Sequence, residues 1–205
     1  MASILNVDQI NNAAGTSGIA LDVSTGKASF PNSVIIPNGA TMPAGSVVQV
    51  VTNTPATTSH VTFSSSPPTM VEADTSYRTT ITPKHSNSIL LLNFSALIGG
   101  RNSGTIMGFK FYDITNSANV GFSALGTGGN RTFVNASFRT VDSDVNDRHH
   151  LNMTAAVSAS TTNSRTYAIY AYKESGQTGD MNMTGTDNAG CSYAPAVFTI
   201  TEIAQ

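Results

Sequence analysis

The strongest pattern in this chain is a strict alternation of apolar and intervening residues from Ile89 to Ile98. Side chains repeat with a period of two along a β-strand, so every second residue of this run faces the same side. The shared face carries Leu90, Leu92, Phe94, Ala96 and Ile98. The pattern predicts a strand with one face in a core, and it limits the chain to folds that contain a packed β-sheet.

Similar runs follow one another from residue 47 to residue 203, separated by clusters of Gly, Asn, Asp and Ser. The predicted strands are 47–51, 75–82, 89–98, 106–114, 120–125, 132–141, 151–157, 165–174 and 197–203. No convincing amphipathic helix interrupts them after residue 46, and strands at this spacing are typical of antiparallel sandwiches. We therefore expect an all-β chain in which residues 47–205 form an antiparallel, jelly-roll-like β-sandwich.

The first 46 residues have a different character. Their apolar residues come in brief pieces between Gly, Asn and Pro, and the run Pro43-Ala44-Gly45 marks a boundary. The first piece fits a strand or a helix, because Ile4, Val7 and Ile10 also have helical spacing. Strands so short and sparsely apolar do not close a core alone. We expect residues 1–46 to be an extended segment that packs against copies of itself or a partner.

Few charges accompany this pattern, since only 11% of the residues are Asp, Glu, Lys or Arg, against roughly 25% in typical globular domains. The ten Lys and Arg residues are scattered, so no basic stripe exists and a nucleic-acid partner is not expected. A single cysteine, Cys191, excludes an intrachain disulfide and favours assembly in a reducing cytoplasm. No signal peptide or membrane-spanning segment is predicted, so we expect no membrane insertion.

Residues 142–150 form the one dense polar cluster. Asp142, Asp144 and Asn146 match the start of a calcium loop, but the expected Gly and closing Glu are replaced by Asp147 and Met153. A solvated loop between strands is the main interpretation and a calcium site the alternative. No ligand-spaced set of His or Cys and no nucleophile motif is present, so we expect neither a cofactor, a metal centre nor a catalytic residue.

Two groups of residues are candidates for ligand contact. The first consists of loop residues beside strong strands: Arg101, Asn102, Asn130 and Arg131. The second is aromatic: Tyr167, Tyr170, Tyr172 and Phe198. Aromatic side chains can stack on a sugar ring, although at strand spacing they more often pack in a core or an interface. Both interpretations of the aromatic group stay open at this point.

Several short phrases of the chain resemble tail-fibre and related virion proteins of tailed bacteriophages, especially cyanophage-like ones. They are Ser3-Ile4-Leu5-Asn6-Val7-Asp8-Gln9-Ile10, Gly18-Ile19-Ala20-Leu21, Pro43-Ala44-Gly45-Ser46-Val47-Val48-Gln49-Val50, Ile81-Thr82-Pro83 with Ser88-Ile89-Leu90-Leu91, and Thr199-Ile200-Thr201-Glu202-Ile203. The resemblance covers both termini and several strands of the expected sandwich.

The resemblance implies a non-enzymatic homotrimer in the virion, assembled in the host cytoplasm. Its N-terminal segment would dock onto other virion proteins, a tail adaptor or the capsid, through Ile4, Leu5, Val7 and Ile10. Its β-domain would project and bind a host-surface glycan or outer-membrane component. The alternatives are a capsid decoration or head-fibre protein with a stabilising role and, as a minor one, a polysaccharide depolymerase.

Overall fold

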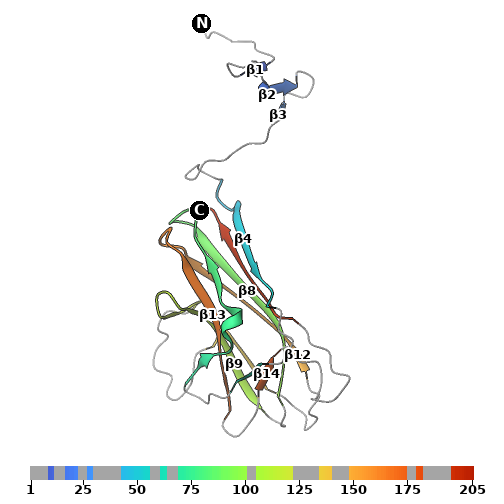
Figure 1. Cartoon of the computed structure of the whole chain (residues 1–205), viewed down its shortest axis with the longest axis vertical. Coiled ribbons are helices and arrows are strands. Elements are labelled where there is room, and N and C mark those ends of the chain that lie inside the picture. Colours follow the sequence, from blue (N-terminus) through green and yellow to red (C-terminus); the bar gives the residue numbers. More distant parts are fainter. Residues whose placement is uncertain are drawn as a thin grey trace. The chain divides into compact units, whose positions relative to one another are not determined.

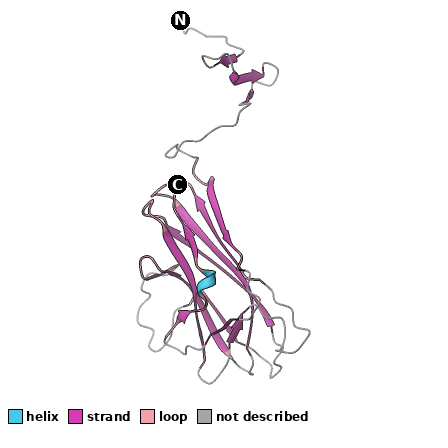
Figure 2. Cartoon of the chain, in the orientation of Figure 1, coloured by secondary structure: helices cyan, strands magenta, loops and turns pink. Residues whose placement is uncertain are grey.

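The computed structural model divides the chain into two compact units, Met1–Ala40 and Thr41–Gln205. It describes residues 9–11, 17–22, 27–29, 43–55, 61–63, 69–100, 105–121, 134–139, 148–174, 179–181 and 195–205. Strands account for nearly all of the regular structure in these ranges, and every pairing between them is antiparallel (Figures 1 and 2). The all-β prediction is therefore confirmed.

The first unit contains a small antiparallel sheet of three strands, β1 (Gln9–Asn11), β2 (Ser17–Asp22) and β3 (Lys27–Ser29), in the order β1-β2-β3. Ile10 lies in β1 opposite Ile19 of β2, so its backbone is a strand and not a helix. Ile4, Leu5 and Val7, which the sequence predicts as docking residues, lie outside the described residues.

The second unit is a sandwich of two six-stranded sheets. The β8 sheet consists of β4 (Val47–Asn53), β5 (Val61–Phe63), β8 (Ile89–Gly100), β12 (Arg148–Ser158), β14 (Gly179–Met181) and β15 (Val197–Ile203). β8 is its central strand. β12 pairs along one edge of β8, and β15 and β14 pair in succession along the other edge. β4 pairs with β15.

The β13 sheet faces it across the core. It consists of β6 (Val71–Glu72), β7 (Thr79–Ile81), β9 (Ile106–Asp113), β10 (Ala118–Asn119), β11 (Ala136–Arg139) and β13 (Arg165–Lys173). β9 pairs with β13, and two short strands extend each of them outward: β10 and β11 on β9, β6 and β7 on β13. A 3-10 turn, η1 (Thr75–Tyr77), connects β6 to β7.

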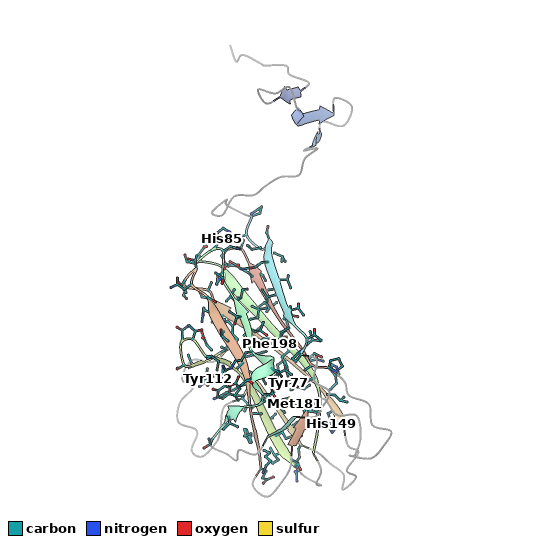
Figure 3. All side chains as sticks on the ribbon, viewed as in Figure 1. Tyr77, His85, Tyr112, His149, Met181 and Phe198 are labelled. Atoms are coloured by element: carbon teal, nitrogen blue, oxygen red, sulfur yellow. The ribbon has the colours of Figure 1, made fainter. Side chains whose placement is uncertain are left out.

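Apolar side chains from both sheets fill the space between them. The predicted inward face of β8 is buried throughout, from Leu90 to Ile98. Phe198 of β15 packs edge-on against Phe94 with ring centroids 6.1 Å apart, and it lies 5.5 Å from Phe111 of the opposite sheet. Tyr77, Met181 and Phe198 all point into this interior (Figure 3). The alternation in the sequence therefore identified the core correctly.

Several predicted boundaries are wrong. Val120, predicted to begin a strand, lies in a bend after β10, and Val134, predicted within a strand, precedes β11. Thr75–Tyr77 is a 3-10 turn and not the start of a strand, because the side chain of Asp74 accepts a hydrogen bond from the backbone N–H of Ser76 and caps the turn. Residues 148–150, assigned to a solvated loop, are the first residues of β12. The register explains this, since they continue the pairing with β8 as far as Gly99.

Side-chain amides join the sheets where β4 lies beside β7. Asn53 donates hydrogen bonds to the carbonyl oxygens of Ser76 (2.8 Å) and Arg78 (3.0 Å). Gln49 donates to the carbonyl oxygen of Thr82 (2.8 Å). These bonds satisfy carbonyl groups of the opposite sheet, and they close this side of the sandwich without a backbone ladder.

A buried carboxylate organises one end of the sandwich. Glu202 of β15 is fully buried and accepts hydrogen bonds from Gln49 (2.6 Å), from the backbone N–H groups of Lys84 (2.9 Å) and His85 (3.0 Å), and from the Ser88 hydroxyl (2.7 Å). Burial alone would raise the pKa of Glu202, but these donors outweigh it and hold the pKa below its ordinary value of 4.5.

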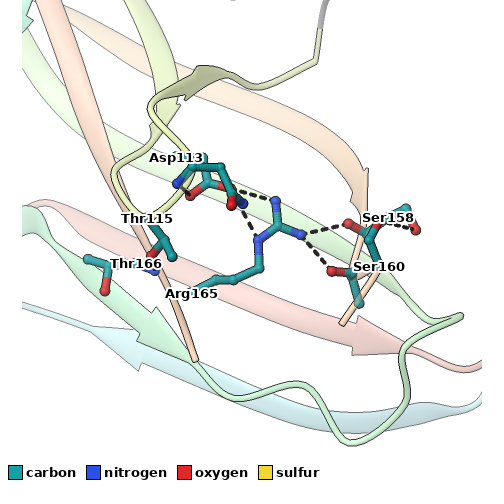
Figure 4. A network of polar contacts seen from close by, with 8 residues as sticks. Asp113, Thr115, Ser158, Ser160, Arg165 and Thr166 are labelled. Carbon is teal, nitrogen blue, oxygen red and sulfur yellow. Dashed lines mark hydrogen bonds and ion pairs between the residues drawn. The ribbon is translucent and has the colours of Figure 1, made fainter. Parts of the chain in front are cut away.

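The network continues from Ser88 into the β13 sheet, where Arg165 lies between Asp113 and the backbone carbonyls of Ser158 and Ala159 (Figure 4). The Ser88 carbonyl accepts the N–H of Ala159 (2.9 Å), and the Ala159 carbonyl accepts Nη1 of Arg165 (2.8 Å). Arg165 Nε donates to Asp113 (3.1 Å), whose carboxylate also accepts the side chain of Asn116 (2.8 Å). Burial raises the pKa of Asp113, but the bonds from Arg165 and Asn116 dominate and lower it.

We predict that Glu202→Gln lowers the free energy of unfolding at pH 7 by about 2–4 kcal/mol. The glutamine NH2 group would face the N–H and O–H donors that bond to the carboxylate in the wild type. The folded pKa of Glu202 is depressed, so this stability is present above pH 4.5 and is lost as the pH falls further. Urea denaturation at a series of pH values from 7 to 3 measures this pH-dependent part of the free energy of unfolding. In acid, the free energy of unfolding of the wild type should approach that of Glu202→Gln. The control Glu174→Gln, at an exposed carboxylate, should have the stability of the wild type at every pH. Parallel pH profiles of wild type and Glu202→Gln would contradict this.

Candidate functional site

Two tyrosines stack on the outer face of the β13 sheet. Tyr112 of β9 and Tyr170 of β13 lie diagonally across the strand pair, since Tyr170 is opposite Lys110 and Tyr112 is opposite Ala168. Their ring centroids are 4.3 Å apart with an interplanar angle of 30°. Diagonal neighbours on adjacent antiparallel strands are within reach of each other's aromatic rings, so the register produces the stack directly.

Lys110 completes the cluster, which we name the tyrosine platform (Lys110, Tyr112 and Tyr170). Its Nζ lies 5.5 Å from the Tyr112 ring centroid and 5.8 Å from that of Tyr170. Partial burial lowers the pKa of Lys110, and burial followed by the charge of Glu72 raises the pKa of Tyr170. The raised pKa keeps Tyr170 neutral at neutral pH, so the platform offers a tyrosine hydroxyl donor beside the lysine side chain.

An ion pair borders the platform. Arg78 donates to both carboxylate oxygens of Glu72, with Nε–Oε1 and Nη2–Oε2 distances of 2.7 Å. Glu72 is opposite Tyr170 in the sheet register. The two hydrogen bonds hold both side chains in one geometry, which a single contact between exposed charges would not do. Charged donors and acceptors therefore have fixed positions beside the aromatic rings.

Tyr172 extends the aromatic surface towards the other end of β13. Its ring lies over Gly108 of β9, directly opposite in the register. A Cβ atom at position 108 would fall on the Tyr172 ring and 2.8 Å from the Val134 side chain. Glycine is favoured here because the Tyr172 ring occupies the place that a side chain at position 108 would fill. Tyr172 is only 9% exposed, so it supports the platform more than it presents a surface.

This arrangement has the features of a shallow binding surface for a sugar. Aromatic rings accept the apolar C–H face of a pyranose, and neighbouring charged and hydroxyl groups exchange hydrogen bonds with its hydroxyls. The rings stand on two long paired strands, so little ordering is required when a ligand binds.

The structure separates the residues that the sequence grouped as an aromatic platform. Tyr167 and Phe198 are fully buried in the core, whereas Tyr170 and Tyr172 are on the outer face. The sugar-stacking interpretation is therefore wrong for Tyr167 and Phe198. The sequence analysis missed Tyr112 as a site residue, although its alternation with Phe111 already placed it on the same face as Lys110.

The predicted contact residues Arg101, Asn102, Asn130 and Arg131 lie outside the described residues, as do Asp142, Asp144 and Asn146 of the calcium alternative. His149 and His150 are adjacent in β12 and face opposite sides: His149 packs on Phe138 and His150 bonds to Asn152. Among the described side chains, no three His, Cys, Asp or Glu residues gather as a metal site. No helix in the described parts of the chain is long and apolar enough to span a membrane.

No protein-family model matches the chain, and no curated protein sequence is similar to it. The assignment of a function consequently rests on the geometry above and on the short phrases described in the sequence.

We predict that Gly108→Ala lowers the free energy of unfolding by about 1–2 kcal/mol, because the new methyl group displaces the Tyr172 ring. In a Tyr172→Ala background the same substitution should cost less, since only the close approach to the Val134 side chain then remains. Denaturation of the wild type, both single variants and the double variant gives this coupling. Equal costs in both backgrounds would contradict the contact.

Proposed function

We propose that the chain is a structural protein of a phage virion: a tail fibre or short fibre that docks to the particle by its N-terminus and presents its β-sandwich to the host surface. The protein would be a non-enzymatic homotrimer with a jelly-roll-like domain. Its target would be a host-cell glycan or an outer-membrane component. The tyrosine platform carries the binding part of this proposal, because it is the described surface best suited to a sugar ring.

The polarity of the sandwich supports an appendage. The chain enters where Gly45 donates to the Ala204 carbonyl (2.8 Å) and Ala204 donates to the Ser46 carbonyl (2.9 Å). β15 pairs antiparallel with β8, so this entry is at the Ile89 end and Gly100 is at the far end. Gly100 and Thr105 flank the predicted contact residues Arg101 and Asn102 in the sequence. Attachment at the Ile89 end would leave both the Gly100 end and the outer face of the β13 sheet, with its tyrosine platform, accessible to the host surface.

We predict that Tyr170→Ala and Tyr112→Ala each weaken binding to cells of the bacterial host at least tenfold, because each removes a stacking face. Tyr170→Phe keeps that face and should retain most of the binding. The measurement is a titration of fluorescently labelled full chain against intact host cells and against polysaccharide extracted from them. Ser86→Ala, at an exposed residue outside the platform, is the control for general surface effects.

The same titration separates the rival functions. A capsid decoration protein would bind neither the cells nor the polysaccharide, and the host-binding proposal would then fail. A depolymerase would release reducing sugar from the polysaccharide, which a binding protein leaves intact. Binding that survives both alanine substitutions would remove the role given to the platform.

We predict that deleting residues 1–20 abolishes incorporation into particles while the sandwich stays folded, because that deletion removes β1 and much of β2 but none of the second unit. Complementation of a phage lacking this gene, followed by analysis of purified particles, measures incorporation. Circular dichroism of the truncated chain reports its fold. Normal incorporation would place the docking residues elsewhere in the protein.

A further inference from the structure

The outer face of the β8 sheet carries no charged side chain wherever its side chains are described. Residues 149–158 of β12 and the whole of β4, β8 and β15 contribute no outward Asp, Glu, Lys or Arg; the one charged residue among them, Glu202, points inward. The face is defined by outward residues in cross-strand register: Val47, Val50, Thr52, Val197, Thr199, Thr201, Ile203, Ile89, Leu91, Asn93, Ser95, Leu97, His150, Asn152, Thr154, Ala156 and Ser158. We name it the uncharged face.

The opposite sheet makes the contrast clear. Its outer face carries Lys110 and, beside it, the Glu72–Arg78 ion pair. Edge strands of soluble sheets are ordinarily protected by charged residues, Pro or bulges that prevent association. β4 is the edge strand of the β8 sheet, and its sequence from Val47 to Asn53 has no charge and no proline. Val47 and Val50 on it are 57% and 55% exposed.

Several polar residues of the uncharged face form hydrogen bonds with one another. Thr52 and Thr199 share a hydrogen bond (3.3 Å), and Thr154 donates to Asn93 (2.8 Å). Burying a polar group is costly only when it loses its partners. These pairs keep their hydrogen bonds when water leaves, so the paired side chains can be covered at little cost in free energy.

Two rows of mainly apolar side chains lie at the end where the chain enters the sandwich. Val47, Ile203 and Ile89 form one cross-strand row there, and Val50, Thr201, Leu91 and Ala156 form the next. Four strands about 4.8 Å apart and about 30 Å long give an area of roughly 600 Å² in projection. That approaches the ~800 Å² per partner found in stable protein interfaces.

We infer that a second copy of this chain covers the uncharged face, so that these faces surround the axis of the homo-oligomer. The inference rests on the proposed homotrimer and assigns its interface. A surface without charges does not attract a charged partner electrostatically, and it is compatible with the same surface on a second copy. The apolar rows also adjoin the Gly45–Ser46 entry, so copies that associate through their N-terminal segments bring these rows together.

Lysine substitution of one exposed valine on each sheet, Val50 and Val71, tests the interface. Val50→Lys should raise the apparent dissociation constant of the oligomer at least tenfold, because an ammonium group would be buried without a partner. Val71→Lys, at the 39% exposed valine of β6 on the other sheet, should leave it unchanged. Both side chains are exposed, so both variants fold, which circular dichroism checks. Sedimentation equilibrium of the full chain gives the oligomeric state.

A distance measurement covers the case in which the first unit alone holds the copies together. Nitroxide labels at Thr52→Cys and, separately, at Val71→Cys are placed in a Cys191→Ser chain, which has no other cysteine. Sheets in a sandwich are about 10 Å apart, so around a three-fold axis the Val71 labels should be farther apart than the Thr52 labels by about 17 Å. Pulsed electron paramagnetic resonance measures both distances. Loss of the oligomer only on labelling Thr52→Cys also supports the interface.

The outcomes separate the inference from the function on which it rests. A monomeric wild-type chain would overturn the homotrimer and the interface together. A wild-type oligomer whose Val71 labels are as close as its Thr52 labels, or closer, would overturn the interface alone.

Discussion

One continuous hydrogen-bond network holds the sandwich together at the end where the chain enters. It runs from Gln49 through Glu202 and Ser88 to Ala159, Arg165 and Asp113, and so connects the edge of one sheet to the central pair of the other. Buried charges destabilise a fold unless every donor and acceptor has a partner. Here the carboxylates of Glu202 and Asp113 are surrounded by donors, and the connection from β12 to β13 is fixed by them.

Because this network and the amides of β4 join the two sheets from within, neither outer face is needed to hold the sandwich together. The two faces therefore differ in chemistry. One presents stacked tyrosines with a lysine and an ion pair, which suits reversible recognition. The other presents aliphatic rows and internally bonded threonines, which suits permanent contact. One sandwich can thereby carry a face suited to contact between copies and a face suited to binding a ligand.

The sequence predicted the core more completely than it predicted the site. Strict alternation identified the buried faces of β8, β9 and β13, since a period of two leaves little choice when one face must be apolar. It did not reveal that Thr75–Tyr77 forms a capped turn, because the Asp74 side chain competes locally with strand formation. Nor did it pair Tyr112 with Tyr170, because that neighbourhood depends on the register of two strands more than fifty residues apart.

The amide groups of Asn53 and Gln49 have one further consequence. They occupy the carbonyl oxygens of Ser76, Arg78 and Thr82, the groups to which a strand from another molecule would otherwise attach. An invading strand would have to displace both amides before it gained a bond of its own. The seam between β4 and β7 is thereby protected against the addition of a strand from another molecule.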